Sequence, residues 1–147
     1  MLLALIVVLA GISVYLNQDW FAKDVIQISH RSRPARATFF RRKRPDSSLV
    51  NPVMFGFDRK VKLTSVAVIP LSDLQTNKYP QAIWHLVSDS NSVPTKTFYY
   101  GEAIRGMRPE VKGATAEPLE PGVPYRLFIA AATFKGEHDF TAEPKNR

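Results

Sequence analysis

The sequence predicts an all-β fold, an antiparallel β-sandwich, preceded by one amino-terminal transmembrane helix. Residues 2–16 are apolar and uncharged, whereas after Pro52 the chain consists of short segments rich in β-branched and aromatic residues, each ended by turn residues. None of these later segments has a long 3.6-residue period. A length of 147 residues leaves room for a single domain, and the absence of cysteine excludes disulfides, thiolate metal sites and a cysteine nucleophile.

The amino-terminal run, residues 2–16, reads LLALIVVLAGISVYL. Fifteen helical residues span roughly 22 Å, less than the roughly 30 Å of a hydrocarbon core, but Tyr15, Trp20 and Phe21 are placed like interfacial aromatics. A cleaved signal peptide and a soluble core helix are the alternatives, although no basic residue precedes the run and it has no polar stripe. We therefore expect residues 1–22 to form a single-pass membrane anchor, with a few residues lost upstream.

The orientation of this expected anchor is open between two sides of the membrane. The positive-inside rule places the arginine-rich flank, and the domain after it, in the cytoplasm. The absence of cysteine and the sandwich character are common in the bacterial envelope, and most of the arginines lie where their influence on topology fades. We expect an extracytoplasmic, periplasmic carboxy-terminal domain, with the cytoplasmic orientation as the alternative.

The net charge of +7 is concentrated next to this run. Residues 17–48 carry eight basic and three acidic side chains, whereas residues 49–147 carry twelve and ten. We expect residues 23–58 to be a basic juxtamembrane linker, with a short strand at residues 25–29. Its consecutive basic residues are Arg41, Arg42, Lys43 and Arg44.

We interpret this basic run as a contact for anionic membrane lipid, because a tethered segment near headgroups meets lipid first. A nucleic-acid patch is a weaker alternative, since two phenylalanines beside the run could stack on bases. A solvated linker without a partner is the third interpretation.

The sandwich itself is expected at residues 59–143, with a tail at residues 144–147. Short strands at roughly ten-residue spacing, with prolines between or beside them, are typical of an antiparallel sandwich. The segments expected to form strands are residues 53–57, 61–69, 82–87, 95–100, 125–133 and 138–142.

The most specific pattern is LEPGVPYRLFIAA at residues 119–131. By the two-residue period of a strand, Tyr125, Leu127 and Ile129 share one face. Tyr125 stands at the strand entrance, where a buried ring needs a partner for its hydroxyl.

This pattern resembles the fibronectin type III sequence L-x-P-G-x-x-Y-x-V-x-V-x-A. The resemblance implies a fibronectin type III or immunoglobulin-like sandwich in which Leu119 closes one end of the core, Pro121 and Gly122 form the turn, and Tyr125 forms the tyrosine corner. The whole layout is also similar to small single-anchor bacterial proteins, which implies no mechanism.

Candidates for chemistry are few. His85, His138 and Met107 are a copper ligand set only if the fold brings them together, and their spacing does not require it. Residues 88–90 (SDS) do not form a recognised catalytic motif, and there is no nucleophile elbow, phosphate loop or dinucleotide motif. We therefore expect no enzymatic activity, no metal, no cofactor and no small-molecule substrate.

The longest connection, residues 101–123, is the expected interaction loop because loops at the end of a sandwich often carry recognition. Its apolar residues could instead plug the open end of the sandwich. The loop residues singled out are Ile104, Arg105, Met107 and Arg108.

These observations together predict a non-enzymatic, membrane-anchored β-sandwich module that presents a surface to another protein of the bacterial cell envelope. The alternative is a cytoplasm-facing membrane protein whose basic linker binds anionic lipid or nucleic acid.

Overall fold

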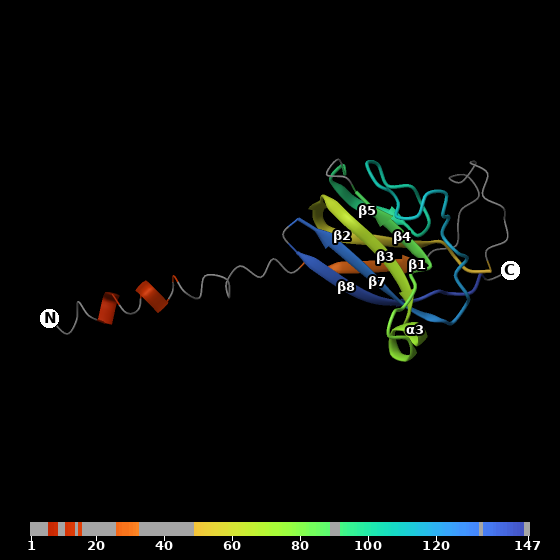
Figure 1. Ribbon diagram of the computed structural model, residues 1–147, viewed down its shortest axis with the longest axis horizontal. Coiled ribbons are helices and arrows are strands. Elements are labelled where there is room, and N and C mark those ends of the chain that lie inside the picture. Colours follow the sequence, from red (N-terminus) through yellow and green to blue (C-terminus); the bar gives the residue numbers. More distant parts are fainter. Residues whose placement is uncertain are drawn as a thin grey trace.

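Two antiparallel sheets make up the described part of the protein in the computed structural model (Figure 1). The three-stranded sheet has the order β1-β2-β5, with β1 (Ile28–Ser32), β2 (Val53–Val61) and β5 (Thr95–Tyr99). The five-stranded sheet has the order β6-β4-β3-β7-β8, with β6 (Arg108–Pro109), β4 (Trp84–Val87), β3 (Leu63–Pro70), β7 (Pro124–Ala131) and β8 (Lys135–Thr141). This arrangement is compatible with the predicted β-sandwich. The structure describes residues 6–8, 11–13, 15, 26–32, 49–88, 92–132 and 134–145.

The amino-terminal run differs from its prediction. Residues 6–8, 11–13 and 15 are helical, but none of the helices in the described residues is both long and apolar enough to cross a membrane. The predicted transmembrane helix at residues 1–22 and the predicted single-pass membrane location are therefore wrong. The apolar composition favoured an anchor, but the short length of the run weighed against it.

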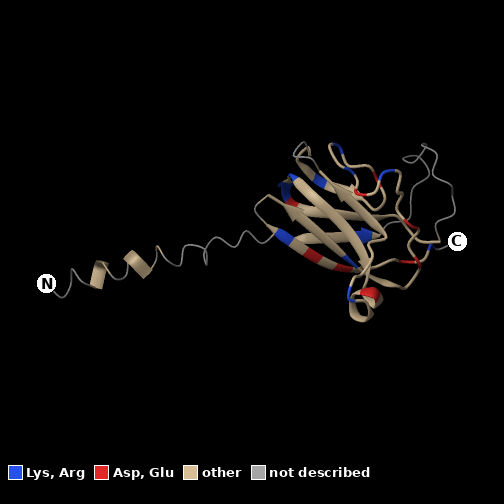
Figure 2. Cartoon of the chain, viewed as in Figure 1, with Lys and Arg blue, Asp and Glu red and all other residues tan. Residues whose placement is uncertain are grey.

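The basic run Arg41, Arg42, Lys43 and Arg44, assigned to lipid contact, lies outside the described residues. In the described domain, basic and acidic residues are interspersed (Figure 2).

The two sheets bury a shared apolar core because their strands alternate. In β2, Val53, Phe55 and Phe57 are buried and the residues between them are not. In β3 the buried residues Leu63 and Val66 are three positions apart, which strict alternation does not allow. The register of β3 against β7 shifts between Leu63 and Ser65, and this bulge returns the following residues to the core face.

Aromatic rings fill the space between the sheets. Phe55 of β2 is completely buried and lies 5.4 Å from Phe98 of β5 and 4.9 Å from Phe140 of β8, as measured between ring centroids. Phe140 stacks in turn on Tyr125 of β7, with centroids 5.7 Å apart. Such ring pairs stabilise a core beyond the apolar area that they bury, so this chain of rings holds the two sheets together.

A hydrogen bond to the hydroxyl of Tyr125 fixes the entrance of β7. Pro121 precedes Gly122, which has a φ of 77°, in the region that favours glycine. The backbone N–H of Glu120 donates to the Tyr125 hydroxyl at 3.0 Å. Leu119, which precedes this turn, is buried in the hydrophobic core. The hydroxyl of a buried ring is thus satisfied by the chain five residues upstream.

The described structure also extends the domain toward the amino terminus. The sandwich was expected to begin at residue 59, but this position falls inside β2. β1 lies within residues 23–58, the range expected to be a linker. β1 pairs with β2 from Ile28 opposite Phe57 to Ser32 opposite Val53. A short helix, α3 (Leu71–Thr76), follows β3 directly; six residues are too few to leave a helical period in the sequence.

Replacing Tyr125 with phenylalanine tests the hydrogen bond between the Glu120 N–H and the Tyr125 hydroxyl. The change leaves the Glu120 N–H without its partner, and we expect the free energy of unfolding to fall by about 1 kcal/mol. Urea denaturation of the full chain measures this. Tyr79→Phe is the control because Tyr79 is 80% exposed, and it should leave stability unchanged. Equal stability of both variants would contradict a structural role for the hydroxyl.

Candidate functional site

A groove of about 570 Å³ lies beside β3 and β4 of the five-stranded sheet. Its lining includes Ala67 and Ile69 of β3, which alternate with the buried Val66 and Val68 and so point to the outward face. The segments 80–83 and 110–117 supply most of the remaining lining. The groove thus has a mainly apolar lining on the face of the sheet that points away from the core.

Backbone hydrogen bonds hold one side of this groove in place. The N–H of Glu110 donates to the carbonyl of His85 at 3.2 Å, and the N–H of Glu117 donates to the carbonyl of Ile83 at 3.0 Å. Between them, Gly113 has a φ of 84° and allows the segment to turn. Both ends of this segment are therefore fixed, one to β4 and the other to the residue that precedes it.

Three polar side chains meet at the same place. The Ser65 hydroxyl oxygen lies 3.1 Å from Nε2 of His85, and Nδ1 of His85 lies 2.5 Å from Oε2 of Glu110. The strand register explains the first contact, since Ala67 lies opposite His85 and Ser65 lies one pair further along the same face. The hydrogen bond from Glu110 to the His85 backbone explains the second.

The protonation pattern of this cluster follows from its chemistry. An ionised carboxylate only accepts hydrogen bonds, so Nδ1 of His85 carries the proton that faces Glu110. In the neutral ring, Nε2 is then an acceptor, and the Ser65 hydroxyl donates to it. The side chain of His85 is 27% exposed and that of Glu110 is 58% exposed, so solvent reaches the cluster.

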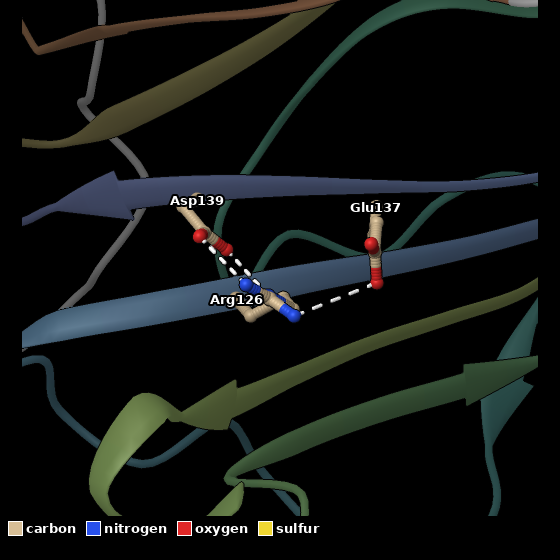
Figure 3. Close-up of polar contacts among 3 residues, drawn as sticks. All are labelled: Arg126, Glu137 and Asp139. Atoms are coloured by element: carbon tan, nitrogen blue, oxygen red, sulfur yellow. Dashed lines mark hydrogen bonds and ion pairs between the residues drawn. The ribbon is translucent and has the colours of Figure 1, made fainter.

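A second charged group lies on the next two strands (Figure 3). Arg126 of β7 donates from Nε to Oδ1 of Asp139 at 2.5 Å and from Nη2 to Oδ2 at 2.8 Å, and its Nη1 lies 3.7 Å from Glu137. The hydrogen bonds from Arg126 lower the pKa of Asp139, and those bonds raise the pKa of Arg126. Since these groups are exposed, the network contributes little to stability. Its main effect is to hold the three charged side chains in fixed positions on the sheet.

Two histidines meet where β1 and β8 contact each other. Nδ1 of His30 and Nε2 of His138 are 2.8 Å apart, a distance that requires a proton on one nitrogen and a lone pair on the other. Burial lowers the pKa of His138, and the neighbouring His30 lowers it further, against a smaller opposing effect of Asp139. We call His30 and His138 the histidine pair.

The predicted interaction loop is divided between the core and the surface. Ile104 is only 6% exposed and belongs to the core, and Met107 packs against that core. Arg105 and Arg108 are exposed, with Arg108 paired to Val87 as part of β6. The apolar residues therefore plug the sandwich, which was the alternative interpretation of this loop.

The structure does not bring together the candidate copper ligands. His85 lies on β4 and His138 on β8, with β3 and β7 between them, so their strands are roughly 14 Å apart at the usual strand spacing. Each histidine has its own partner. Within the described ranges no group of three or more potential histidine, aspartate or glutamate ligands is present.

Sequence reasoning missed the cluster of Ser65, His85 and Glu110. The period of β4 placed His85 on one face with Ile83 and Val87, but nothing local links it to a serine twenty residues earlier or a glutamate twenty-five residues later. Only the strand register and the loop bonds bring them together.

Comparison with protein-family models, with curated proteins and with solved structures found no match. The structure defines the class, an all-β protein of two antiparallel sheets.

The histidine pair predicts that stability falls at mildly acidic pH. In the unfolded chain His138 takes up a proton near its ordinary pKa of about 6.5, whereas in the folded state it does so only at lower pH. The unfolded state therefore binds more protons as the pH falls below about 6.5, and the free energy of unfolding decreases. Urea denaturation of the full chain at about pH 7.5 and about pH 5.5 measures this decrease.

In His138→Phe we expect a smaller decrease, because the titrating group is gone. The control His85→Gln removes a histidine that lies away from the pair, and it should keep the contribution of the pair. An unchanged decrease in His138→Phe would contradict the assignment.

Proposed function

We propose that this protein is a binding module that holds a segment of a partner protein in the groove beside β3 and β4. The observation that carries the proposal is the groove itself, about 570 Å³ in volume with a mainly apolar lining on the outward face of a sheet. Its size is in the range of sites that bind ligands. The role we propose for the groove is recognition of that segment.

We also propose that the module is a variant of the fibronectin type III sandwich. In that family strands A, B and E form one sheet and C′, C, F and G the other, an arrangement that the orders β1-β2-β5 and β4-β3-β7-β8 support. The position of Tyr125 at the start of β7 supports it as well, because the tyrosine corner stands at the start of strand F. β6 would then be an addition beside C′.

The chemistry of the groove indicates the kind of segment that fits. Ala67 and Ile69 offer apolar contacts from β3, and Val111 and Ala114 offer them from the opposite side. Glu110 also lines the groove and is exposed, so a cation beside it would gain from charge complementarity. We therefore propose an extended segment that carries a lysine or arginine next to apolar residues.

Nucleic acid fits this site poorly. The groove carries the carboxylates of Glu110 and Glu117, which repel phosphates, and its lining contains no lysine or arginine. The part of the chain from residue 49 onward is also close to neutral, with twelve basic and ten acidic residues. A protein segment is the better match in both shape and charge.

Selection of random peptides displayed on phage against the immobilised full chain tests the proposal. We expect enriched peptides to carry a lysine or arginine flanked by apolar residues. A synthetic peptide of the enriched sequence should bind Ala67→Arg at least about tenfold more weakly than the unmodified protein, a difference of about 1.4 kcal/mol. The introduced side chain would fill the groove and repel the cation.

Thr141→Arg is the matched control for this experiment. It places the same charge on an exposed position of β8, away from the groove, and should leave peptide binding unchanged. Enrichment of peptides without a cation, or equal binding to Ala67→Arg, would contradict the proposed occupant.

A further inference from the structure

We propose that Ser65 is an activated nucleophile that accepts an acyl group from an activated ester or thioester, with His85 as its general base and Glu110 as the group that orients the base. The three side chains form one continuous chain of contacts, 3.1 Å from serine to histidine and 2.5 Å from histidine to glutamate. A nucleophile, a base and an orienting carboxylate in this sequence of contacts are the arrangement that makes a serine hydroxyl reactive.

The fold holds each member of this cluster by a separate constraint. Ser65 lies on β3, which is paired on both sides, with Val87 opposite on β4 and Ala130 opposite on β7. The bulge between Leu63 and Ser65 turns the serine to the outward face, and bulges of this kind often re-aim a side chain beside a functional site. Glu110 is held by its own backbone bond to the carbonyl of His85.

The groove gives an acyl donor access to the cluster. His85 and Glu110 both line the groove, and Ser65 lies two residues before Ala67 on the same face of β3. Two residues along a strand are roughly 7 Å apart, so a small donor in the groove can reach the serine. The reaction with a small donor does not depend on the protein segment proposed for the groove.

The transfer balances without any other reactant. The Ser65 oxygen forms a bond to the carbonyl carbon of the donor while its proton moves to Nε2 of His85. The bond from that carbon to the oxygen or sulfur of the leaving group then breaks, and the leaving group takes the proton from Nε2. The products are an ester on Ser65 and a free alcohol or thiol, with His85 neutral again and Glu110 ionised throughout.

The position of Ser65 in the sheet also determines how reactive its hydroxyl should be toward acyl donors. A serine on a tight turn can use backbone N–H groups beside it to stabilise the developing oxyanion. β3 is paired on both sides, so its backbone groups are largely engaged in the sheet. General-base assistance alone contributes about 10²- to 10⁴-fold, which favours donors with good leaving groups and a long-lived ester on the serine.

Incubation of the full chain with 4-nitrophenyl acetate tests this proposal. The absence of cysteine removes thiol acylation as a background. We expect release of 4-nitrophenolate in a burst of about one equivalent, and peptide mass mapping should locate the acetyl ester on Ser65.

Variants separate the roles of the three residues. Ser65→Ala should abolish the labelled peptide, and His85→Gln and Glu110→Gln should each slow labelling at least about tenfold, since assistance by a positioned base is worth at least that much. Ser88→Ala is the matched control, because the Ser88 hydroxyl bonds to the carbonyl of Gly106 and has no histidine partner. The exposed position of Glu110 makes Glu110→Gln informative even if Ser65→Ala fails to fold.

Two outcomes would support the proposal: a stable ester on Ser65, or slow turnover that requires Ser65. Acetyl groups found only on lysines or the amino terminus, labelling of Ser65 no faster than Ser88, or unchanged labelling in His85→Gln would overturn it. None of these results would alter peptide binding in the groove, so the two proposals can fail separately.

Discussion

β3 pairs with both of its neighbours in a single register, and this pairing fixes the core as well as the outward face of the sheet. Val66 and Val68 of β3 are completely buried and lie opposite Leu86 and Trp84 of β4. A slip of one residue would expose these valines and bury the polar face, a cost that fixes the register strongly. The same register places Ser65 beside His85 and opens the groove on the outward face.

The aromatic core and the outward face are therefore two consequences of the same alternation. Phe55 and Phe140 join the sheets on the inside, and the side chains left outside are free to carry function. The binding and acyl-transfer proposals both use that outer surface, and neither asks the buried core to move. This separation allows substitutions in the groove to be made without disturbing the interior.

Much of the all-β architecture could be predicted because it depends on local sequence patterns. The alternation of apolar and polar residues and the spacing of prolines predicted most of the strands, and the 119–131 motif indicated where a strand would begin. Properties that depend on distant residues could not be predicted: the pairing of β1 with β2 crosses a charged segment, and the contact of Ser65 with His85 exists only through register. The anchor prediction was wrong because apolar composition was weighed above length.

Nitrogen NMR of the imidazole ring at neutral pH measures the tautomer of His85, which the contacts with Ser65 and Glu110 determine. We expect a proton on Nδ1, facing Glu110, and an unprotonated Nε2 facing Ser65. In Glu110→Ala this preference should disappear, because the carboxylate that selects the tautomer is gone. A proton on Nε2 in the unmodified protein, or an unchanged tautomer in Glu110→Ala, would contradict the account.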